Sequence, residues 1–320
     1  MDEIEQRNNT QIKFYGTGGE YFGILVLNIL LTIITLGIYY PWAKTKSRKF
    51  FTSNTYFADS PLSYHGTGTE LFKGFIVVVL FIILYNIINF VVESTGNTYI
   101  INIYGMLSML FIFTLIPLSI HGSMKYRASR TSWRNIFFTY DGDRREFVIL
   151  FLKSILFFII TFGFYFSWAE VNISKYIIEK HGLGNVKTSF TGKGGDLFMI
   201  HLAGLILTIF TFGIYSFWYT KNIYNYYINN TFLHQGEKTI AIDSSISGGG
   251  IFSLSFINML LIIFSFGIAI PWVIIRTMNF YIDNIYIEEN LNPDEIIQGE
   301  IASRVNSIGD GMVDALDIGF

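Results

Sequence analysis

Long apolar runs alternate with short polar segments along this chain. The first run, 22–42, contains no charged residue. It is long enough to cross a membrane, because about 20 residues rising about 1.5 Å each span a hydrocarbon core of roughly 30 Å. Five further runs of similar character follow, at 74–92, 99–120, 147–169, 197–219 and 250–275. The pattern therefore predicts six transmembrane helices.

Four of the runs end in the same short motif, a threonine or serine followed by a large apolar residue and a glycine. The motif reads TLGIYYPWA at 35–43, TFGFYFSWA at 161–169, TFGIYSFWY at 211–219 and SFGIAIPWV at 265–273. Each copy contains a tryptophan, a ring that suits the headgroup level of a bilayer because one of its edges is polar. We therefore expect interface anchors at Trp42, Trp168, Trp218 and Trp272.

Basic residues follow the first copy of this motif. They come directly after the aromatic side chains, where a chain leaving a bilayer meets lipid phosphates. We expect contacts with anionic lipid from Lys44, Lys46, Arg48 and Lys49. Mixed polar and apolar stretches also follow the other copies, and these predict amphipathic helices in the interface.

A glycine-rich motif precedes the apolar runs. It reads FYGTGGEYF at 14–22, FTGKGGDLF at 190–198 and YHGTGTELF at 64–72, with weaker copies in YDGDRREF and ISGGGIF. One interpretation is a loop that holds a phosphate. The other is a tight turn into a helix, with the acidic residue facing the positive end of the helix dipole. Neither the Walker nor the dinucleotide fingerprint is complete here, so the sequence favours the turn.

The two motifs together divide the chain into repeated units. Their approximate bounds are 14–63, 64–139, 140–189, 190–245 and 246–290, followed by a polar tail at 291–320, all within one membrane domain, 1–320. Segments between the units, such as NTYFADSPLSYHG, combine strand formers with turn residues. The expected fold class is an all-α polytopic membrane protein. It has about six transmembrane helices in repeated modules, with short β-hairpins and interfacial amphipathic helices outside the bilayer.

Two sets of small or polar residues recur at matched positions. Gly37, Gly163, Gly213 and Gly267 lie in the four motif copies, and they predict either helix breaks or sites of close helix packing. Nine residues before three of these glycines stand Asn28, Ser154 and Asn258, and Gly204 stands before the fourth. This shared depth predicts either a polar helix contact or a polar path for a solute.

The composition excludes several kinds of chemistry. The chain is 51% hydrophobic and only 14% charged, against about 25% charged in a soluble domain, so apolar surface is expected to face lipid. It contains no cysteine, its five histidines form no HExxH motif, and its net charge of −2 gives no bias toward nucleic acid. We predict no catalytic residue, no cofactor, no metal, no nucleic-acid partner and no enzyme activity.

Several of these segments together resemble the YjgN-like family of bacterial inner-membrane proteins. The segments are FxGxGGExF, TLGIYYPWAKTKSRKF, the SYHGTG return and the tail IGDGMVDALDIGF. The resemblance extends over nearly the whole chain and implies a multi-pass protein of the bacterial cytoplasmic membrane. It implies no activity, substrate or catalytic residue. The last motif copy departs from the pattern, because SFGIAIPWV lacks the tyrosine.

Three functions are consistent with this sequence. A transporter or channel for a small solute is the leading expectation, because repeated modules with polar residues at matched depth are typical of transporters. The alternative is a structural or lipid-organising protein that binds anionic lipid through its basic helices. An intramembrane enzyme is third, since no nucleophile motif supports it. The expected partners are membrane lipid and a small solute, and the sequence does not indicate an oligomeric state.

Overall fold

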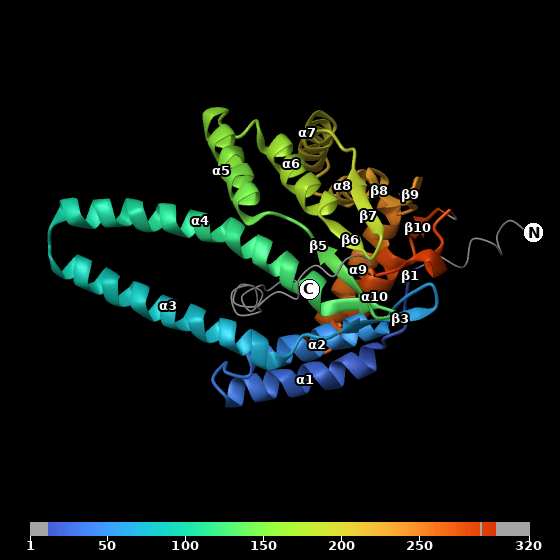
Figure 1. The fold of residues 1–320 in the computed structure, drawn as a ribbon, viewed down its shortest axis with the longest axis horizontal. Helices are drawn as coiled ribbons and strands as arrows, with labels where there is room; N and C mark the ends of the chain where they lie inside the picture. The colour runs from blue at the N-terminus through green and yellow to red at the C-terminus, as the bar shows by residue number, and fades with distance from the viewer. Residues whose placement is uncertain (1–11, 289, 299–320) are drawn as a thin grey trace, which may run out of the picture.

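A computed structural model of the chain describes residues 12–288 and 290–298. Within these residues a strand, two helices and a second strand follow one another five times (Figure 1). The helices are α1 (Gly18–Ile34), α2 (Tyr40–Asn54), α3 (Gly68–Ser94), α4 (Thr98–Arg130), α5 (Arg144–Ile160), α6 (Phe166–Glu179), α7 (Gly194–Phe210), α8 (Ser216–Asn229), α9 (Gly248–Phe264) and α10 (Ile270–Ile282). The strands are β1 (Ile12–Phe14), β2 (Thr55–Phe57), β3 (Ser60–Tyr64), β4 (Thr131–Trp133), β5 (Ile136–Tyr140), β6 (His181–Leu183), β7 (Val186–Phe190), β8 (Thr231–Gln235), β9 (Lys238–Ser244) and β10 (Ile285–Ile287), and a short 3-10 helix, η2, follows at Pro293–Glu295.

The strands of the described chain form one sheet, in which they pair in chain order from β1 to β10. Neighbouring strands are antiparallel, as in the register that pairs Phe14 of β1 with Thr55 of β2. Tight turns join the successive units. Ala58 and Asp59 both have positive φ, 45° and 55°, between β2 and β3, which is the backbone that a two-residue hairpin requires. Every helix pair is therefore an insertion between two paired strands.

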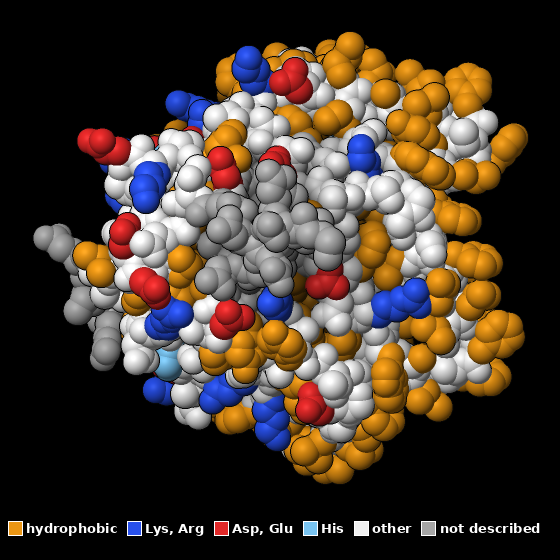
Figure 2. Space-filling model, turned by 90° about the vertical axis from the view of Figure 1, so that its right-hand side faces the viewer, with side chains coloured by type: hydrophobic (Ala, Val, Ile, Leu, Met, Phe, Trp, Pro, Cys, Tyr) orange, Lys and Arg blue, Asp and Glu red, His pale blue; other side chains and the backbone are white. Residues whose placement is uncertain are grey.

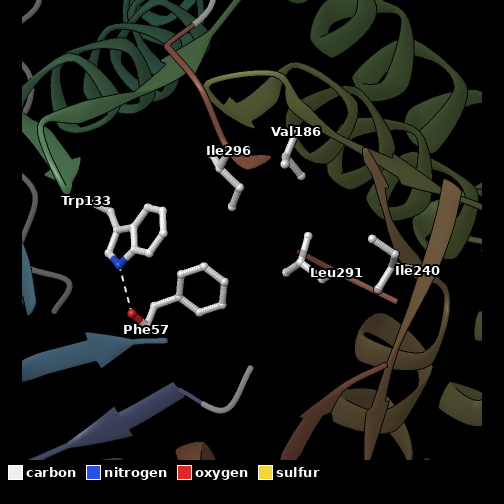
Figure 3. Packing of buried hydrophobic residues seen from close by; sticks show 6 residues of the cluster. All are labelled: Phe57, Trp133, Val186, Ile240, Leu291 and Ile296. Atoms are coloured by element: carbon white, nitrogen blue, oxygen red, sulfur yellow. Dashed lines mark hydrogen bonds between the residues drawn. The ribbon is translucent and has the colours of Figure 1, made fainter. Parts of the chain in front are cut away.

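The interior of the curved sheet is filled by one side chain from each of several units (Figure 3). Phe57, Trp133, Val186 and Ile240 are buried there, and the Trp133 indole Nε1 donates to the Phe57 carbonyl at 2.8 Å. Leu291 and Ile296 from the segment after β10 complete this core. Hydrogen bonds from the hairpin turns hold that segment in place. The Gln235 Nε2 donates to the Asn292 carbonyl at 2.8 Å, and the Asn292 N–H donates to the Gln235 Oε1 at 2.9 Å.

The helices form a closed ring above the sheet. The second helix of each unit packs on the first helix of the next, and the contact between α10 and α1 closes the circle. One backbone bond recurs in every unit, from the residue after the first strand to the end of the second helix. The donor and acceptor pairs are Tyr15 to Asn54, His65 to Arg130, Asp141 to Lys180, Thr191 to Asn230 and Ser245 to Asn284. The units therefore superimpose residue by residue at their bases.

The glycine-rich motif is a turn from strand to helix. In the first copy the Glu20 N–H donates to the Thr17 Oγ1 at 3.3 Å, and the Thr17 N–H donates to the Glu20 Oε2 at 3.1 Å. This reciprocal cap satisfies two donors at the start of α1. Thr67 and Glu70 repeat it at the start of α3.

The predicted fold class, an all-α protein with six spans, is wrong in two respects. Four of the predicted spans, 22–42, 147–169, 197–219 and 250–275, reverse direction at the glycine of the shared motif, and each supplies two short helices. A hydropathy profile does not detect such a turn, because the residues of the turn are themselves mostly apolar. Among the described residues two helices, Gly68–Ser94 and Thr98–Arg130, are long and apolar enough to cross a membrane. The strands are also not separate hairpins, since they pair edge to edge into one ten-stranded sheet.

Candidate membrane-insertion surface

In four of the helix pairs, the two helices are joined by a turn in which every backbone N–H group has a hydrogen-bond acceptor. In the first, all N–H groups from Thr35 to Tyr40 find acceptors within the turn or the end of α1. The Tyr39 N–H donates to the Thr35 Oγ1 at 3.0 Å, and the Gly37 N–H donates to the Thr32 carbonyl at 2.7 Å. The same bonds recur in the turns 161–166, 211–216 and 265–270. Pairing all of these donors lowers the free-energy cost of placing such a reversal in hydrocarbon, where no water is present to bond them.

The residue at the tip of each of these turns is large, apolar and almost fully exposed. The exposed fractions are 93% for Leu36, 94% for Phe162, 98% for Phe212 and 94% for Phe266. Their φ angles lie between 49° and 51°, a left-handed region that costs a residue with a side chain about 1–2 kcal/mol. An aqueous turn would favour asparagine or glycine at such a position. The apolar choice in all four turns indicates a tip that enters an apolar medium. We name these four residues the tip residues.

The remaining helix pair, α3 and α4, differs in both length and tip. Helix α3 has 27 residues against 17 for α1, so it projects about 15 Å further from the sheet at 1.5 Å per residue. Figure 1 shows this pair extending well beyond the others. Its connection is polar, and the Asn97 Oδ1 caps α4 by accepting from the Tyr99 N–H at 3.0 Å. A polar tip suits water or headgroups on the far side of a bilayer.

The motif glycines Gly37, Gly163, Gly213 and Gly267 lie at these helix breaks. Their φ angles are between 87° and 93°, which a residue with a Cβ rarely adopts. Nothing lies within 4 Å of where a Cβ would be at Gly37 or Gly213, and one side chain at 3.6 Å or more is met at Gly163 and Gly267. Their role in the structure is therefore backbone conformation in the turn, and close helix packing occurs at other glycines.

Close packing occurs where a tryptophan of one unit meets a glycine of the next. The pairs are Trp42 with Gly68, Trp168 with Gly194, Trp218 with Gly248 and Trp272 with Gly18. A Cβ at any of these glycines would lie between 2.3 and 2.5 Å from the indole Cδ1, far inside van der Waals contact. The predicted anchor tryptophans thus join neighbouring units, and each keeps part of its ring exposed. We name these contacts the tryptophan–glycine joints.

Sequence reasoning missed these joints, although the chain carries a signal for them. In the third unit the position of the glycine is occupied by Arg144, and the matching position of the preceding helix is Leu118 instead of tryptophan. The two residues change together because a Cβ and an indole cannot share the space. Comparing the repeats pair by pair would have revealed the contact.

The polar positions Asn28, Ser154 and Asn258 are buried inside their own helix pairs. The Asn28 Nδ2 donates to the Ala43 carbonyl at 3.1 Å, and the Asn258 Nδ2 donates to the Thr277 Oγ1 at 3.0 Å. The Ser154 hydroxyl donates to the Leu150 carbonyl of its own helix at 2.9 Å. Each asparagine therefore ties the two helices of one pair together, which is the behaviour of a polar helix contact.

The basic residues after the first turn have several different surroundings. The Lys44 and Lys46 Nζ atoms lie 6.0 Å and 5.4 Å from the ring centroids of Tyr40 and Tyr39. The Arg48 Nη1 donates to the Tyr64 hydroxyl at 3.4 Å. Lys46 and Lys49 have exposed side chains. Arg48 belongs to a polar cluster within the protein, so the predicted contact with anionic lipid stays a prediction for the exposed Lys46 and Lys49.

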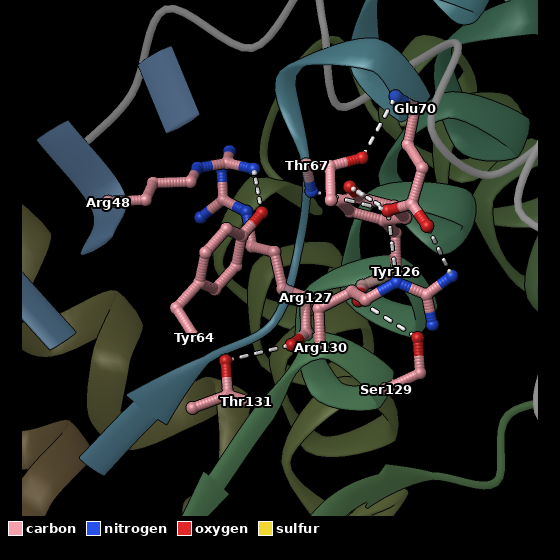
Figure 4. Close-up of polar contacts among 9 residues, drawn as sticks. All are labelled: Arg48, Tyr64, Thr67, Glu70, Tyr126, Arg127, Ser129, Arg130 and Thr131. Carbon is pink, nitrogen blue, oxygen red and sulfur yellow. Dashed lines mark hydrogen bonds and ion pairs between the residues drawn. The ribbon is translucent and has the colours of Figure 1, made fainter. Parts of the chain in front are cut away.

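That cluster clamps the bases of the two long helices (Figure 4). The Glu70 carboxylate of α3 accepts from the Arg130 Nε at 3.1 Å and from Nη2 at 3.2 Å. It also accepts from the Tyr126 hydroxyl at 3.0 Å. A bidentate guanidinium pair fixes both distance and orientation. The cluster therefore holds α3 and α4 together where they leave the sheet.

A second polar cluster links α6, α7 and α8. The His201 Nδ1 lies 2.6 Å from the Tyr219 hydroxyl, and its Nε2 lies 3.1 Å from the Glu170 Oε2. The Tyr227 hydroxyl donates to the other carboxylate oxygen at 2.7 Å. Every polar atom in this set has a partner within the protein, so the arrangement ties helices together. No group of three or more metal-binding side chains occurs among the residues that the structure describes.

Apolar and charged side chains occupy different parts of the molecular surface. Figure 2 shows hydrophobic side chains crowding the right-hand side of that view, whereas most charged side chains lie over the remainder. The exposed apolar residues include the four tip residues and most of the outer faces of α3 and α4. A soluble monomer rarely exposes contiguous apolar patches of more than a few hundred Å².

An apolar surface with water-independent turns, together with two helices of membrane-spanning length, defines a membrane protein. This chain belongs to a family described as "Bacterial protein of unknown function (DUF898)", whose model matches residues 9–190, 185–238 and 234–315. It is 32% identical to "Inner membrane protein YjgN" of Salmonella typhimurium over 143 residues, which are 44% of this chain and 34% of that protein. The protein of the same name in Escherichia coli K12 is 32% identical over 134 residues, 42% of this chain and 32% of the relative. The aligned region thus spans about a third of the length of these relatives. No solved structure matches.

Proposed function

We propose that this protein organises lipid in the bacterial inner membrane by inserting asymmetrically from the cytoplasmic face. In this proposal α3 and α4 cross the bilayer, and the four shorter helix pairs enter one leaflet and return. The exposed, left-handed, apolar tip residues carry the proposal. The relatives named as inner membrane proteins support the location.

The helix lengths set the depth of insertion. The uncharged part of α3 begins at Gly74, and the matching residue of α1 is Ile24. From Ile24 to the end of α1 the helix rises about 16 Å, close to half of a hydrocarbon core of about 30 Å. The tip residues would therefore lie near the middle of the bilayer. Lysines near the entrance, such as Lys153, would extend their ammonium groups back to the headgroups.

The distribution of basic residues sets the orientation. The connection between α3 and α4, residues 95–97, contains no lysine or arginine, and neither do the four apolar turns. Lysines and arginines of the described chain instead lie on the sheet side and the helix bases. Because basic segments stay on the cytoplasmic side, the sheet would face the cytoplasm.

This arrangement places very different volumes of protein in the two leaflets. Ten helices of the described chain would occupy the cytoplasmic leaflet, and only α3 and α4 would continue into the other. Extra volume in one leaflet bends a membrane toward that side, as interfacial helices do. Transport receives less support, because the Asn28 and Asn258 Nδ2 atoms donate within their own helix pairs and both side chains are buried there.

The test compares the native chain with a variant in which all four tip residues are changed to asparagine. Asparagine tolerates the left-handed region, so the turns keep their shape. Both proteins are inserted from outside into detergent-destabilised vesicles of two sizes. The number of native protein molecules per unit of membrane area should be several-fold higher on the small vesicles than on the large ones. The variant should lose this preference.

Changing Ser63, Lys187, Thr239 and Asp243, four exposed polar residues of the sheet, to asparagine gives a control with the same number of substitutions. That control should keep the preference for small vesicles. Equal density of the native protein on both sizes would overturn the proposal. Solute flux through native vesicles that persists in the tip variant would favour transport instead.

A further inference from the structure

A cavity of about 530 Å³ lies at the seam where the last unit meets the first. Gly18 of α1, together with Gly250 and Leu254 of α9, forms one side of it. The other side is a stripe that consists of Trp272, Arg276 and Asn279 of α10 and of Asp283, which caps the end of that helix. These four positions have the i, i+4, i+7, i+11 spacing that places residues on one face of a helix.

The polar groups of this stripe lack partners within the described part of the chain. Neither the Arg276 guanidinium nor the Asp283 carboxylate forms a hydrogen bond or ion pair with another described residue. The Asn279 Oδ1 is buried and has no donor. A buried acceptor without a donor costs about 1–3 kcal/mol. One cation and one anion, each without a partner among the described residues, therefore line the same cavity, with the Asn279 side chain between them.

This unit lacks the acidic residue that the other four carry at the matching position, and the Phe280 ring lies against Gly250 instead. Glu20, Glu70, Glu146 and Asp196 occupy the matching position of the first helix in the other units. In the second and third units the acid accepts from the hydroxyl of Tyr126 or Tyr176. Here the two positions hold Gly250 and Phe280, so neither the carboxylate nor the hydroxyl fills the space. No carboxylate of α9 opposes the charge of Arg276.

The cavity lies at the level where a headgroup would sit. Ser253 and Leu254 match Lys73 and Gly74 of α3, where the charged first turns give way to the uncharged run. Along α10, Trp272 is nearest the apolar tip, Arg276 follows, and Asp283 is nearest the sheet. A phospholipid that enters from the bilayer would meet these residues in that order.

We infer that this cavity binds the headgroup of a zwitterionic phospholipid of the ethanolamine type. The glycerol end lies against Trp272, the phosphate pairs with Arg276, and the ammonium pairs with the Asp283 carboxylate. Arginine suits phosphate because its planar donors bind two oxygens at once. A glycerol headgroup places neutral hydroxyls where the ammonium would meet Asp283, so it loses this charge pairing and binds less well. The inference rests on the proposed function only in placing the cavity at headgroup level.

The test measures binding of short-chain phosphatidylethanolamine to the full-length protein in mild detergent. Parallel titrations use short-chain phosphatidylglycerol and inorganic phosphate. The variants are Arg276→Gln and Asp283→Asn, and Lys238→Gln is the matched control because it removes a charge from the exposed start of β9. Arg276→Gln should weaken binding of the ethanolamine lipid by about tenfold or more. Asp283→Asn should reduce the ratio of the affinity for the ethanolamine lipid to the affinity for the glycerol lipid. The control should bind both lipids like the native protein.

Two outcomes would overturn the inference. One is equal affinity of the native protein and Arg276→Gln for the ethanolamine lipid. The other is inorganic phosphate that competes as strongly as the lipid, which would make the cavity a site for free anions. The tip variant separates this inference from the proposed function, because it should lose the preference for small vesicles and still bind the ethanolamine lipid.

Discussion

Trp272 of the last helix pair packs on Gly18 of the first, and this contact closes the ring of helices. A Cβ on Gly18 would lie 2.3 Å from the indole Cδ1 and 2.9 Å from the tryptophan Cα. Because the second of these is a backbone atom, the clash cannot be relieved by rotating a side chain. The first and last units of the chain are therefore held together by a fit that tolerates no side chain at residue 18.

Changing Gly18 to alanine should destabilise the protein, because the new methyl group forces α1 and α10 apart. Overpacking of this kind typically costs about 1–3 kcal/mol. The matched control is Gly19→Ala, since nothing lies within 4 Å of a Cβ at Gly19. Thermal unfolding in detergent should show a lower midpoint for Gly18→Ala and little change for Gly19→Ala. Equal midpoints would mean that the seam is not closed.

Single cysteines should report three kinds of environment, since the native chain has none. Ser53→Cys and Lys238→Cys lie at the sheet side and are exposed. Both should react with an impermeant maleimide from the cytoplasmic face. Thr95→Cys, in the connection between α3 and α4, should react from the opposite face. Phe212→Cys should stay protected from both faces until the membrane is dissolved. Labelling of residues 53 and 238 from opposite faces would contradict the one-sided arrangement.

The ion pair between Glu70 and Arg130 should stabilise the base of the long helices. Both side chains are largely shielded, with 26% and 16% of their surface exposed. Glu70→Gln or Arg130→Gln alone leaves one shielded charge without its partner, which costs about 1–3 kcal/mol. The double variant should lose less than the sum of the two, because neither charge is then stranded. Unfolding free energies of the four proteins give this cycle directly.

Glu20→Gln provides a comparison, because Glu20 occupies the same position in the first unit and has no ion pair with a described residue. It should change the unfolding free energy by less than Glu70→Gln does. A purely additive cycle at residues 70 and 130 would show that the two charges act independently.

His181 should make the protein less stable in mild acid. Burial lowers the pKa of this imidazole below its ordinary value near 6.5, although the bond between its Nδ1 and the Ile177 carbonyl acts the other way. The unfolded chain therefore binds a proton at a higher pH than the folded protein does. Stability should fall as the pH drops from about 6.5 toward the lowered pKa, because protonation then favours the unfolded state. Unfolding measured across this range should show a flatter profile for His181→Asn, and an unchanged slope would exclude His181 as the source.

The sequence by itself showed that two short motifs recur along the chain, and it favoured a turn into a helix for the glycine-rich one. The Thr-x-Gly motif and the glycine-rich motif are local patterns whose effects depend on a few neighbouring residues. A glycine with positive φ and a threonine that bonds its own backbone act within one turn. The resemblance to the family could likewise be read from such segments, and the family comparison confirmed it.

Only the tertiary structure decided whether an apolar run continues or reverses. Hydropathy gives the same value to a straight helix and to two helices joined by Leu36 and Gly37, because every residue of that turn is apolar or bonded to its own backbone. Contacts between distant units are likewise absent from local patterns. The joint between Gly18 and Trp272 exists because five units of similar shape close into a ring. That closure depends on the rotation from each unit to the next, which is set by packing across the whole sheet.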